Sequence, residues 1–189
     1  MARLRHLLPA LAAATLLATG CGYNTIQTKD EAVNAAGSQI KTQLQRRADL
    51  IPNLVETVKG FAKQETTVFI RVTEARSRLN TAVQGGNLQE MAAANAALNA
   101  PLGRLLATVE NYPELKSNQN FLQLQDQLEG TENRISVARQ DYNRAVEDFN
   151  AYIRRFPYVL TAKLTGHGKP REYFELTTPG AAEAPKVKF

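Results

Sequence analysis

The chain has 189 residues, of which 43% are hydrophobic and 22% charged, so it is long enough for one folded domain and too apolar for a disordered protein. Aromatic residues make up only 7%, tryptophan is absent, and Ala, Leu, Gln and Asn abound, a composition that favours helices over sheets. The formal net charge is a modest +5, which excludes a strongly basic or strongly acidic class of protein.

The first 20 residues, MARLRHLLPALAAATLLATG, are typical of a secretory signal. Arg3 and Arg5 form a basic start, an apolar run extends from Leu7 to Ala18, and small residues end the segment. We expect residues 1–20 to be removed, which leaves 21 Lys and Arg against 18 Asp and Glu, a net charge of +3. So small and dispersed a charge predicts no nucleic-acid partner.

Cys21, the only cysteine, follows directly in LLATGCGYN. Small residues before a cysteine that ends an apolar run resemble the lipobox of bacterial lipoproteins, in which the thiol carries a diacylglycerol. We expect residues 21–24 to form a lipidated anchor to the membrane, since each buried methylene contributes about 0.8 kcal/mol. Gly22 is not the aspartate that retains many lipoproteins in the inner membrane, so we expect the outer membrane, facing the periplasm.

Apolar residues at helical spacing predict two helices in the next part of the chain. The first, roughly 25–47, has a weak apolar side. We expect Asp49 to cap the second helix, Pro52 to be tolerated in its first turn, and Gly85-Gly86-Asn87 to end it. Its heptad positions are Ile51, Val58, Glu65, Val72 and Leu79, paired with Leu54, Phe61, Val68, Ala75 and Ala82.

Two further helices follow, and the second of them has the clearest heptads. Asn87 is expected to cap the first of these, Pro101 to kink or break it, and Pro113 to close it. Ser117 is expected to cap the last helix and Pro157 to end it at residue 156. The seam of this helix is Phe121, Leu128, Ile135, Tyr142, Phe149 and Phe156, with Leu124, Thr131, Ala138, Ala145 and Tyr152 as the partner row.

Helical spacing of apolar residues along almost the whole chain predicts an all-α fold. Short connections between the predicted helices make neighbouring helices antiparallel. We expect an antiparallel up-and-down four-helix bundle with long heptad-patterned helices over residues 25–165. Residues 166–189 are expected to form a partly mobile C-terminal extension, whose first apolar pieces could fold back on the bundle.

Several long motifs resemble the LemA family. RRADLIPNLVETVKGFAKQE (46–65) with VTEARSR (72–78) is similar to the central signature of that family, and NYPELKSNQNFLQLQDQLEGTENRISVARQDYN (111–143) with FNAYIRRFP (149–157) to its second. GCGYNTIQTKDEAVNAA (20–36) is similar to the lipoprotein-anchored branch. The resemblance implies a four-helix antiparallel bundle held at a membrane and facing away from the cytoplasm. It implies no enzymatic activity, and because many relatives use a transmembrane helix instead of a lipid, it leaves the inner membrane open.

Glu65 falls in the apolar row between Val58 and Val72, where an unpaired charge is costly. We expect a structural polar lock that fixes the register of the helices; partial exposure and a ligand site are the alternatives. The expected partners are Arg134, Arg139, Arg154 or Tyr142.

A polar face at the start of the last helix is formed by Asn118, Gln119 and Gln123, with further amides around them. A solvated helix surface is the simpler interpretation. The alternative is a face that docks another protein, because amides can be buried at an interface without a charge penalty.

Residues for catalysis or metal binding are scarce. After removal of the signal only His167 remains as a histidine, between two glycines, and we expect it in a solvated loop. There is no nucleophile motif, no Cys or His set for zinc and no Gly-rich phosphate loop, so we expect no enzyme, no cofactor and no metal site.

The sequence therefore predicts a non-enzymatic, lipid-anchored cell-envelope protein whose helices act as a scaffold or adaptor for other envelope proteins. The resemblance adds a role in envelope assembly or stress signalling. The alternative is a sensor or carrier of a small ligand or lipid. Its cavity would come from Gly37, where many family members carry tryptophan, and from the Pro101 kink.

Overall fold

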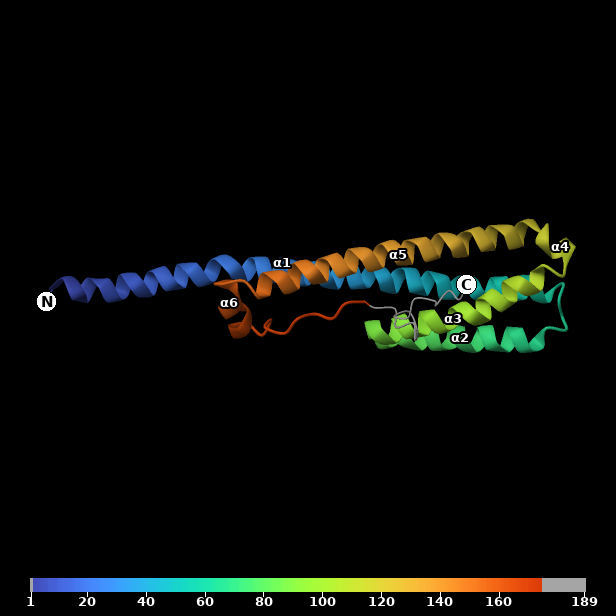
Figure 1. Ribbon diagram of the computed structural model, residues 1–189, viewed down its shortest axis with the longest axis horizontal. Helices are drawn as coiled ribbons and strands as arrows, with labels where there is room; N and C mark the ends of the chain where they lie inside the picture. Colours follow the sequence, from blue (N-terminus) through green and yellow to red (C-terminus); the bar gives the residue numbers. More distant parts are fainter. Residues whose placement is uncertain (1, 175–189) are drawn as a thin grey trace, which may run out of the picture. The chain divides into compact units, whose positions relative to one another are not determined.

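The first helix, α1 (Ala2–Lys59), is much longer than the sequence predicts (Figure 1). The computed structural model describes residues 2–174, with side chains described from residue 22 onward. Buried apolar residues recur without a gap along α1; they are Ile26, Val33, Ile40, Leu44, Ala48, Ile51, Leu54, Val55 and Val58. Because this stripe is continuous, α1 runs through Asp49 and Pro52, and the prediction that Asp49 caps a helix is wrong.

The chain turns between residues 60 and 65 before α2 (Thr66–Gly85) begins. Gly60 follows the last residue of α1, and Glu65 immediately precedes α2 with a half-buried side chain that caps no helix N–H. The second predicted helix was therefore wrong in its limits, because its first turns belong to α1 and its remainder to α2.

The turn between α2 and α3 (Leu88–Val109) has the predicted residues in the predicted roles. Gly86 has a left-handed φ of 75°, and its N–H donates to the carbonyl of Ala82. The side chain of Asn87 accepts from the N–H groups of Gln89 and Glu90, at 2.9 and 3.3 Å, which confirms it as the cap of α3. Figure 1 shows α2 and α3 running back along each other from this turn.

Helix α3 continues through Pro101, where the sequence predicts a kink or a break. A proline removes one helical hydrogen bond and leaves the carbonyl four residues earlier without its N–H donor. That residue is Ala97, which is exposed, so water can take the place of the donor. Seven buried residues hold α3 in place: Met91, Ala92, Asn95, Leu98, Leu102, Leu105 and Val109.

Three helices complete the described chain: α4 (Pro113–Lys116), α5 (Gln119–Ile153) and α6 (Tyr158–Leu164). Asn118, not Ser117, caps α5, by accepting from the N–H groups of Asn120 and Phe121 at 3.0 and 3.1 Å. Helix α5 ends three residues earlier than predicted. Residues 2–174 contain helices, turns and irregular segments but no strand, which confirms the all-α class.

The described residues form two compact units, and α1 and α5 contribute to both. Unit 1 consists of residues 2–37 and 140–173, and unit 2 of residues 38–139 with Phe174. The predicted seam of α5 is buried in both units: Phe121, Leu128 and Ile135 in unit 2, and Tyr142 and Phe149 in unit 1. The last member of that seam, Phe156, is 80% exposed, because the helix has ended before it.

Candidate functional site

Arg47 is buried in unit 2, and its guanidinium joins three helices. It is 5% exposed on α1. Its Nη1 donates to Oδ1 of Asn95 at 2.7 Å and its Nη2 to Oδ1 of Asn99 at 3.0 Å, both on α3. Nη1 also forms an ion pair with Oε2 of Glu132 on α5. The side chain of Arg47 therefore ties α1 to α3 and α5.

Burial lowers the pKa of Arg47, and the neighbouring carboxylate of Glu132 opposes that shift. An arginine stays charged under these conditions, so the charge depends on its acceptors for stabilisation. Among the described residues Nε has no partner, and Glu132 is half exposed, which weakens the ion pair through solvent screening. Asn95, 3% exposed, is therefore the deepest of the three acceptors. A buried charge with fixed acceptors on two other helices suits a role in setting helix register.

The heptad pattern predicts this kind of role for Glu65 and not for Arg47. Arg47 follows Leu44 by three residues and precedes Ile51 by four, so it lies inside the apolar stripe of α1. That spacing indicates a buried position for Arg47. The prediction that the first helix ends near residue 47 favoured another interpretation, because cations are common at the C-terminal ends of helices.

A second arginine ties α2 to α1 within unit 2. Nε of Arg76 donates to the backbone carbonyl of Ala48 at 2.8 Å. In a regular helix that carbonyl would accept from the N–H of residue 52, but Pro52 has no N–H. The proline in α1 therefore leaves an acceptor that the guanidinium of Arg76 occupies, and the two helices are joined at that point.

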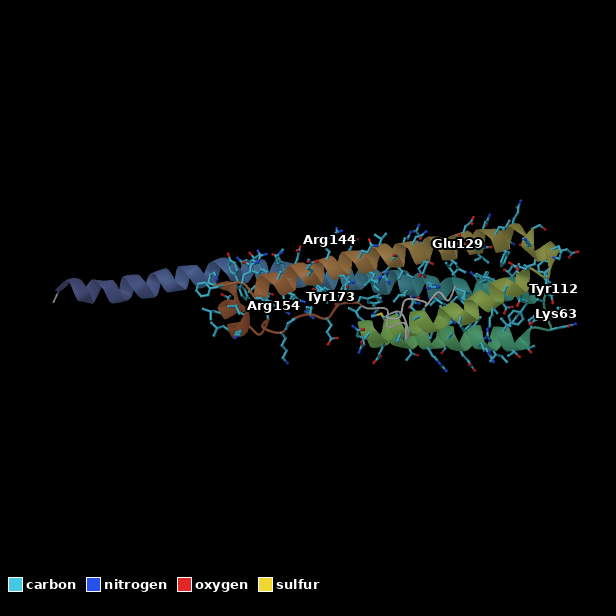
Figure 2. All side chains as sticks on the ribbon, viewed as in Figure 1. Lys63, Tyr112, Glu129, Arg144, Arg154 and Tyr173 are labelled. Carbon is cyan, nitrogen blue, oxygen red and sulfur yellow. The ribbon has the colours of Figure 1, made fainter. Side chains whose placement is uncertain are left out.

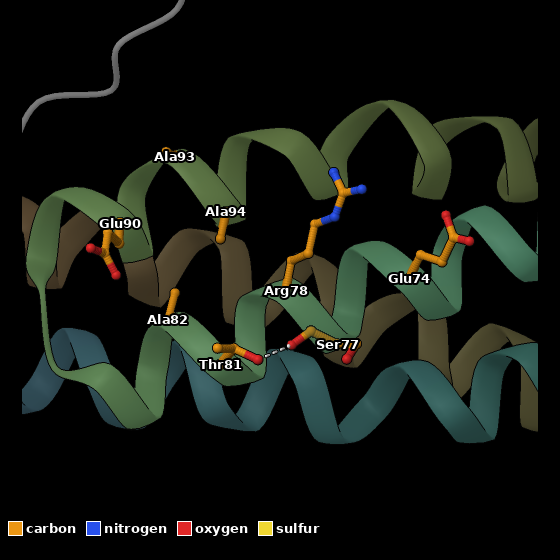
Figure 3. Close-up of a pocket in the computed structure, with 8 residues that line it drawn as sticks. All are labelled: Glu74, Ser77, Arg78, Thr81, Ala82, Glu90, Ala93 and Ala94. Carbon is orange, nitrogen blue, oxygen red and sulfur yellow. Dashed lines mark hydrogen bonds between the residues drawn. The ribbon is translucent and has the colours of Figure 1, made fainter.

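A groove of about 670 Å³ runs between α2 and α3 (Figure 3). Helix α2 lines it with four polar or charged side chains and one alanine, and α3 lines it with two alanines and an acid. The lining residues are Glu74, Ser77, Arg78, Thr81, Ala82, Glu90, Ala93 and Ala94. The small side chains of Ala93 and Ala94 leave the groove open to solvent, where a second molecule has access to it.

A second hollow, of about 490 Å³, adjoins this groove on α2 and shares Glu74 and Ser77 with it. It is more apolar, because Phe69 and Ile70 line it, and Ile70 is 58% exposed. Nζ of Lys59 lies 5.9 Å from the ring centre of Phe69. The exposed side of α2 thus offers an apolar patch next to a polar groove.

The residues of the predicted polar face lie around the start of α5 and do not form one site. Asn118 is half-buried, and its amide oxygen accepts the hydrogen bonds that cap α5. Gln119 and Gln123 are exposed. A hollow of about 580 Å³ between α3 and α5 is lined instead by Leu122 and Gln125, among others. Docking at the predicted face stays a prediction.

Cys21, Asp49 and Glu65, which the sequence predicts as lipid anchor, helix cap and polar lock, all lie in or next to helices. The backbone of Cys21 belongs to α1, while its side chain lies outside the described part. Asp49 is exposed on α1 and accepts from Nε2 of Gln45 at 2.9 Å. Glu65 lies in the turn before α2, not in a helical seam, so it does not occupy the position that the polar-lock prediction required.

In unit 1 a buried asparagine holds the segment after α6 by its backbone. Oδ1 of Asn150 on α5 accepts from the N–H of Arg171 at 2.8 Å, and Nδ2 donates to the carbonyl of the same residue at 2.9 Å. The guanidinium of Arg171 donates to Oδ1 of Asp30 on α1, through Nε at 3.1 Å and Nη2 at 2.8 Å. Residues near 171, assigned in the sequence analysis to a partly mobile extension, are thus fixed to two helices of the unit.

His167 and Tyr142 add to the same attachment. Nδ1 of His167 lies 3.2 Å from Oγ1 of Thr165, and Nε2 lies 3.4 Å from Nε2 of Gln27, so the ring is not in a fully solvated loop as predicted. The hydroxyl of Tyr142 donates to the carbonyl of Glu172 at 3.0 Å. Burial raises the pKa of Tyr142, the charge of Arg171 lowers it, and the charge of Glu172 adds to the rise.

The described residues hold few means for chemistry. No group of three or more His, Cys, Asp or Glu side chains among them is arranged to hold a metal ion. None of their helices combines the length and the apolar character needed to cross a bilayer. What unit 2 does provide is a helical framework joined by Arg47 and Arg76, with an open, partly apolar surface on α2.

Comparison with known proteins gives relatives in several bacteria. Magnetosome protein MamQ 2 of Paramagnetospirillum magneticum is 30% identical over 176 residues, which covers 81% of this chain and 64% of the relative. Magnetosome protein MamQ of Magnetospirillum gryphiswaldense is 27% identical, with 80% and 64% covered. Protein LemA of Metamycoplasma hominis is 24% identical over 134 residues, with 70% and 60% covered. The chain therefore matches less than two thirds of the length of these relatives.

The model of the LemA family matches residues 36–189, a region that includes Arg47, both arms of the α2–α3 groove and all of α5. That range covers well over half of the sequence and both signatures on which the resemblance was based. The chain belongs to the LemA family.

Proposed function

We propose that this protein is a non-enzymatic, lipid-anchored component of the bacterial cell envelope that acts as a scaffold for other envelope proteins. Membership of the LemA family and relatives in bacteria support a membrane-associated envelope protein. The apolar run that ends at Cys21 supports anchoring by lipid. The adaptor role itself rests on the surface of α2.

The observation that carries the proposal is the pair of adjoining hollows along α2. Ile70 is a large apolar side chain held in contact with water, and polar side chains of the groove begin one turn beyond it. An apolar centre with a polar rim is the arrangement found at protein–protein interfaces. We infer a protein partner that inserts an apolar side chain beside Ile70 and hydrogen-bonds along the groove.

The contacts beneath this surface fit a preformed binding face. Arg76, from the same helix, holds α2 to α1 through the carbonyl of Ala48, and Arg47 holds α1 to α3. A partner then finds α2 and α3 already in position and loses little affinity to ordering them. A rigid scaffold needs this property, whereas an enzyme would need reactive groups that converge on one point.

Photo-crosslinking in living cells tests the adaptor role. A photoreactive amino acid replaces Ser77 in the full lipidated chain, and the matched control replaces Asn133, an exposed residue of α5 in the same unit. We expect Ser77 to capture one envelope protein in a stoichiometric band and Asn133 to capture none. Ile70→Asp should abolish that band, while Val137→Asp, at a similarly exposed site, should not. Equal labelling from both positions, or none, would refute the adaptor role.

Lipid attachment is tested separately. Cells fed a clickable palmitate should label the wild-type chain, and Cys21→Ser should remove the label and release the protein from membranes. A wild-type chain that stays unlabelled would refute the lipid anchor.

Native mass spectrometry of the purified chain tests the small-ligand alternative. A lipid or metabolite that is bound by the wild type and also by the Ile70→Asp variant would favour a carrier.

A further inference from the structure

Helix α6 in unit 1 presents an apolar side to solvent. Leu160 and Leu164 lie one turn apart and are 52% and 82% exposed, and Phe156, four residues before Leu160, is 80% exposed. Thr161 and Ala162, on the other side of the same helix, are buried. Phe156 and Leu164 are the most exposed large hydrophobic side chains of the described residues. A cluster of this kind marks an interaction surface.

In the segment that carries this apolar cluster, every charged side chain is basic. From Arg154 to Arg171 the sequence contains no aspartate and no glutamate. The basic side chains of Arg154, Arg155, Lys163 and Lys169 are exposed, and Figure 2 shows Arg154 projecting near α6. Exposed apolar side chains bordered by Lys and Arg match the chemistry of an anionic bilayer surface.

Unit 1 also places α6 next to the part of α1 that directly follows Cys21. Gly22 is buried against Tyr158, the first residue of α6, so closely that a Cβ at Gly22 would lie 2.6 Å from Cδ1 of that ring. The ring of Tyr158 stacks on Tyr152 of α5, with their centres 4.4 Å apart. Gly22 directly follows Cys21 and the apolar run from Leu7 to Ala18. With the chain anchored at Cys21, as proposed above, α6 begins close to the bilayer.

We propose that Phe156, Leu160 and Leu164 insert into the interfacial layer of an anionic membrane, while Arg154, Arg155 and Lys163 bind its phosphate groups. The proposal rests on the membrane attachment included in the proposed function, and it does not depend on the scaffold role. The N-terminal anchor alone leaves the chain free to swivel about one point. A second contact through α6 fixes unit 1 against the membrane surface, because long basic side chains reach the headgroups while their apolar neighbours enter the bilayer.

Tryptophan fluorescence tests this contact directly, because the chain contains no tryptophan of its own. The full chain with Leu164→Trp is reconstituted in vesicles of phosphatidylcholine and phosphatidylglycerol, and vesicle-bound protein is isolated by flotation. Val137→Trp, at an exposed apolar site of α5 in unit 2, is the matched control. Brominated lipids should remove about half of the emission of the Leu164→Trp reporter, for a side chain about 5–10 Å below the headgroups. The Val137→Trp reporter should keep its emission.

Charge variants test the second half of the proposal. Arg154→Gln with Arg155→Gln should lower the quenching of the Leu164→Trp reporter, and high salt should do the same. Arg144→Gln, at an exposed residue of α5, is the control and should leave the quenching unchanged. Vesicles without phosphatidylglycerol should also give weaker quenching.

Equal quenching of the Leu164→Trp and Val137→Trp reporters, or none for either, in chains that float with the vesicles, would overturn the proposal. A chain that does not float at all would refute both the anchor and this contact. Neither result bears on crosslinking from Ser77, so the failure of the α6 contact and the failure of the scaffold role are distinguishable.

Discussion

Units 1 and 2 each bury a polar side chain that joins separate segments, but the two side chains bind different partners. In unit 2, Arg47 is a charge whose acceptors are side chains on α3 and α5. In unit 1, Asn150 is neutral and forms two hydrogen bonds with the backbone of Arg171, in a segment without regular structure. The Arg47 contacts join helices whose backbone N–H and C=O groups are already hydrogen-bonded within each helix. The Asn150 contacts supply hydrogen-bond partners to backbone groups of a segment that has no helical hydrogen bonds of its own.

The difference predicts unequal costs when each contact is broken. Removing an acceptor from Arg47 leaves a charge buried without compensation, whereas removing Asn150 leaves two neutral backbone groups near the surface of unit 1. Unit 2 should therefore lose global stability. Unit 1 should lose the local order of one segment.

Asn95→Leu should have the largest effect. It removes the deepest acceptor of Arg47 and leaves the guanidinium buried, which should cost about 3 kcal/mol in the free energy of unfolding measured by urea titration. Arg47→Met combined with Asn95→Leu should recover most of this loss, because the charge has gone with its acceptor. Asn133→Leu, at an exposed site, is the control. Additive costs in the double variant would show that the pair is not coupled.

Asn150→Ala should cost about 2 kcal/mol and act locally, since two hydrogen bonds to the backbone of Arg171 are lost together. Hydrogen exchange at the amide of Arg171 should accelerate, while amides of α3 in unit 2 keep their protection. Gln140→Ala, at an exposed position of α5, provides the comparison. Unchanged exchange at Arg171 would contradict the assigned role of Asn150.

Arg76→Met should destabilise unit 2 by about 1–2 kcal/mol, because the carbonyl of Ala48 then lacks a donor. Its cost should be smaller in a Pro52→Ala background, where the helix supplies its own N–H to that carbonyl. A urea-unfolding cycle of the two single variants and the double variant measures the coupling. Equal costs in both backgrounds would show that Pro52 and Arg76 act independently.

Two glycine variants should shift stability in opposite directions by about 1 kcal/mol each. Gly103→Ala in α3 of unit 2 meets nothing within 4 Å and should stabilise the protein, since glycine lowers helix stability. Gly22→Ala in unit 1 would press against the ring of Tyr158 and should destabilise it. Thermal unfolding of both variants checks the signs. Stabilisation by Gly22→Ala would show that the ring of Tyr158 moves at little cost to make room for the added methyl group.

The smallest effect should come from pH. Burial raises the pKa of Tyr142, so the folded state keeps this proton at a pH where the unfolded chain, with an ordinary value of about 10, has begun to lose it. Its contribution to stability is complete below about pH 10 and falls as the pH rises towards the folded value. The stability difference between wild type and Tyr142→Phe should therefore shrink between about pH 8 and about pH 10.5 in urea titrations. An equal stability difference at both pH values would contradict a raised pKa of Tyr142 in the folded state.

Sequence reasoning succeeded where the signal is local. The helix end at Gly85-Gly86 and the cap at Asn87 follow from the chemistry of those residue types, and both are present. It failed at Asp49, which lies inside α1, and a break at Pro101 was also wrong because α3 continues through it. A kink at Pro101 stays a prediction. In both helices buried apolar contacts outweigh one weak signal. The carbonyl that Pro52 frees, that of Ala48, accepts from Arg76, and the residue whose carbonyl Pro101 frees, Ala97, is exposed to solvent.

By itself the sequence determined the all-α class, the buried seams and the α2–α3 turn, because periodicity and capping act over a few residues. Only the tertiary structure decided which polar residues join the helices. Arg47 meets Asn95 across 48 positions of sequence, and Asn150 meets Arg171 across 21. The Arg47 and Asn150 contacts depend on how distant segments are brought together. The spacing of Arg47 within the apolar stripe indicates burial, but it does not identify Asn95, Asn99 and Glu132 as its acceptors.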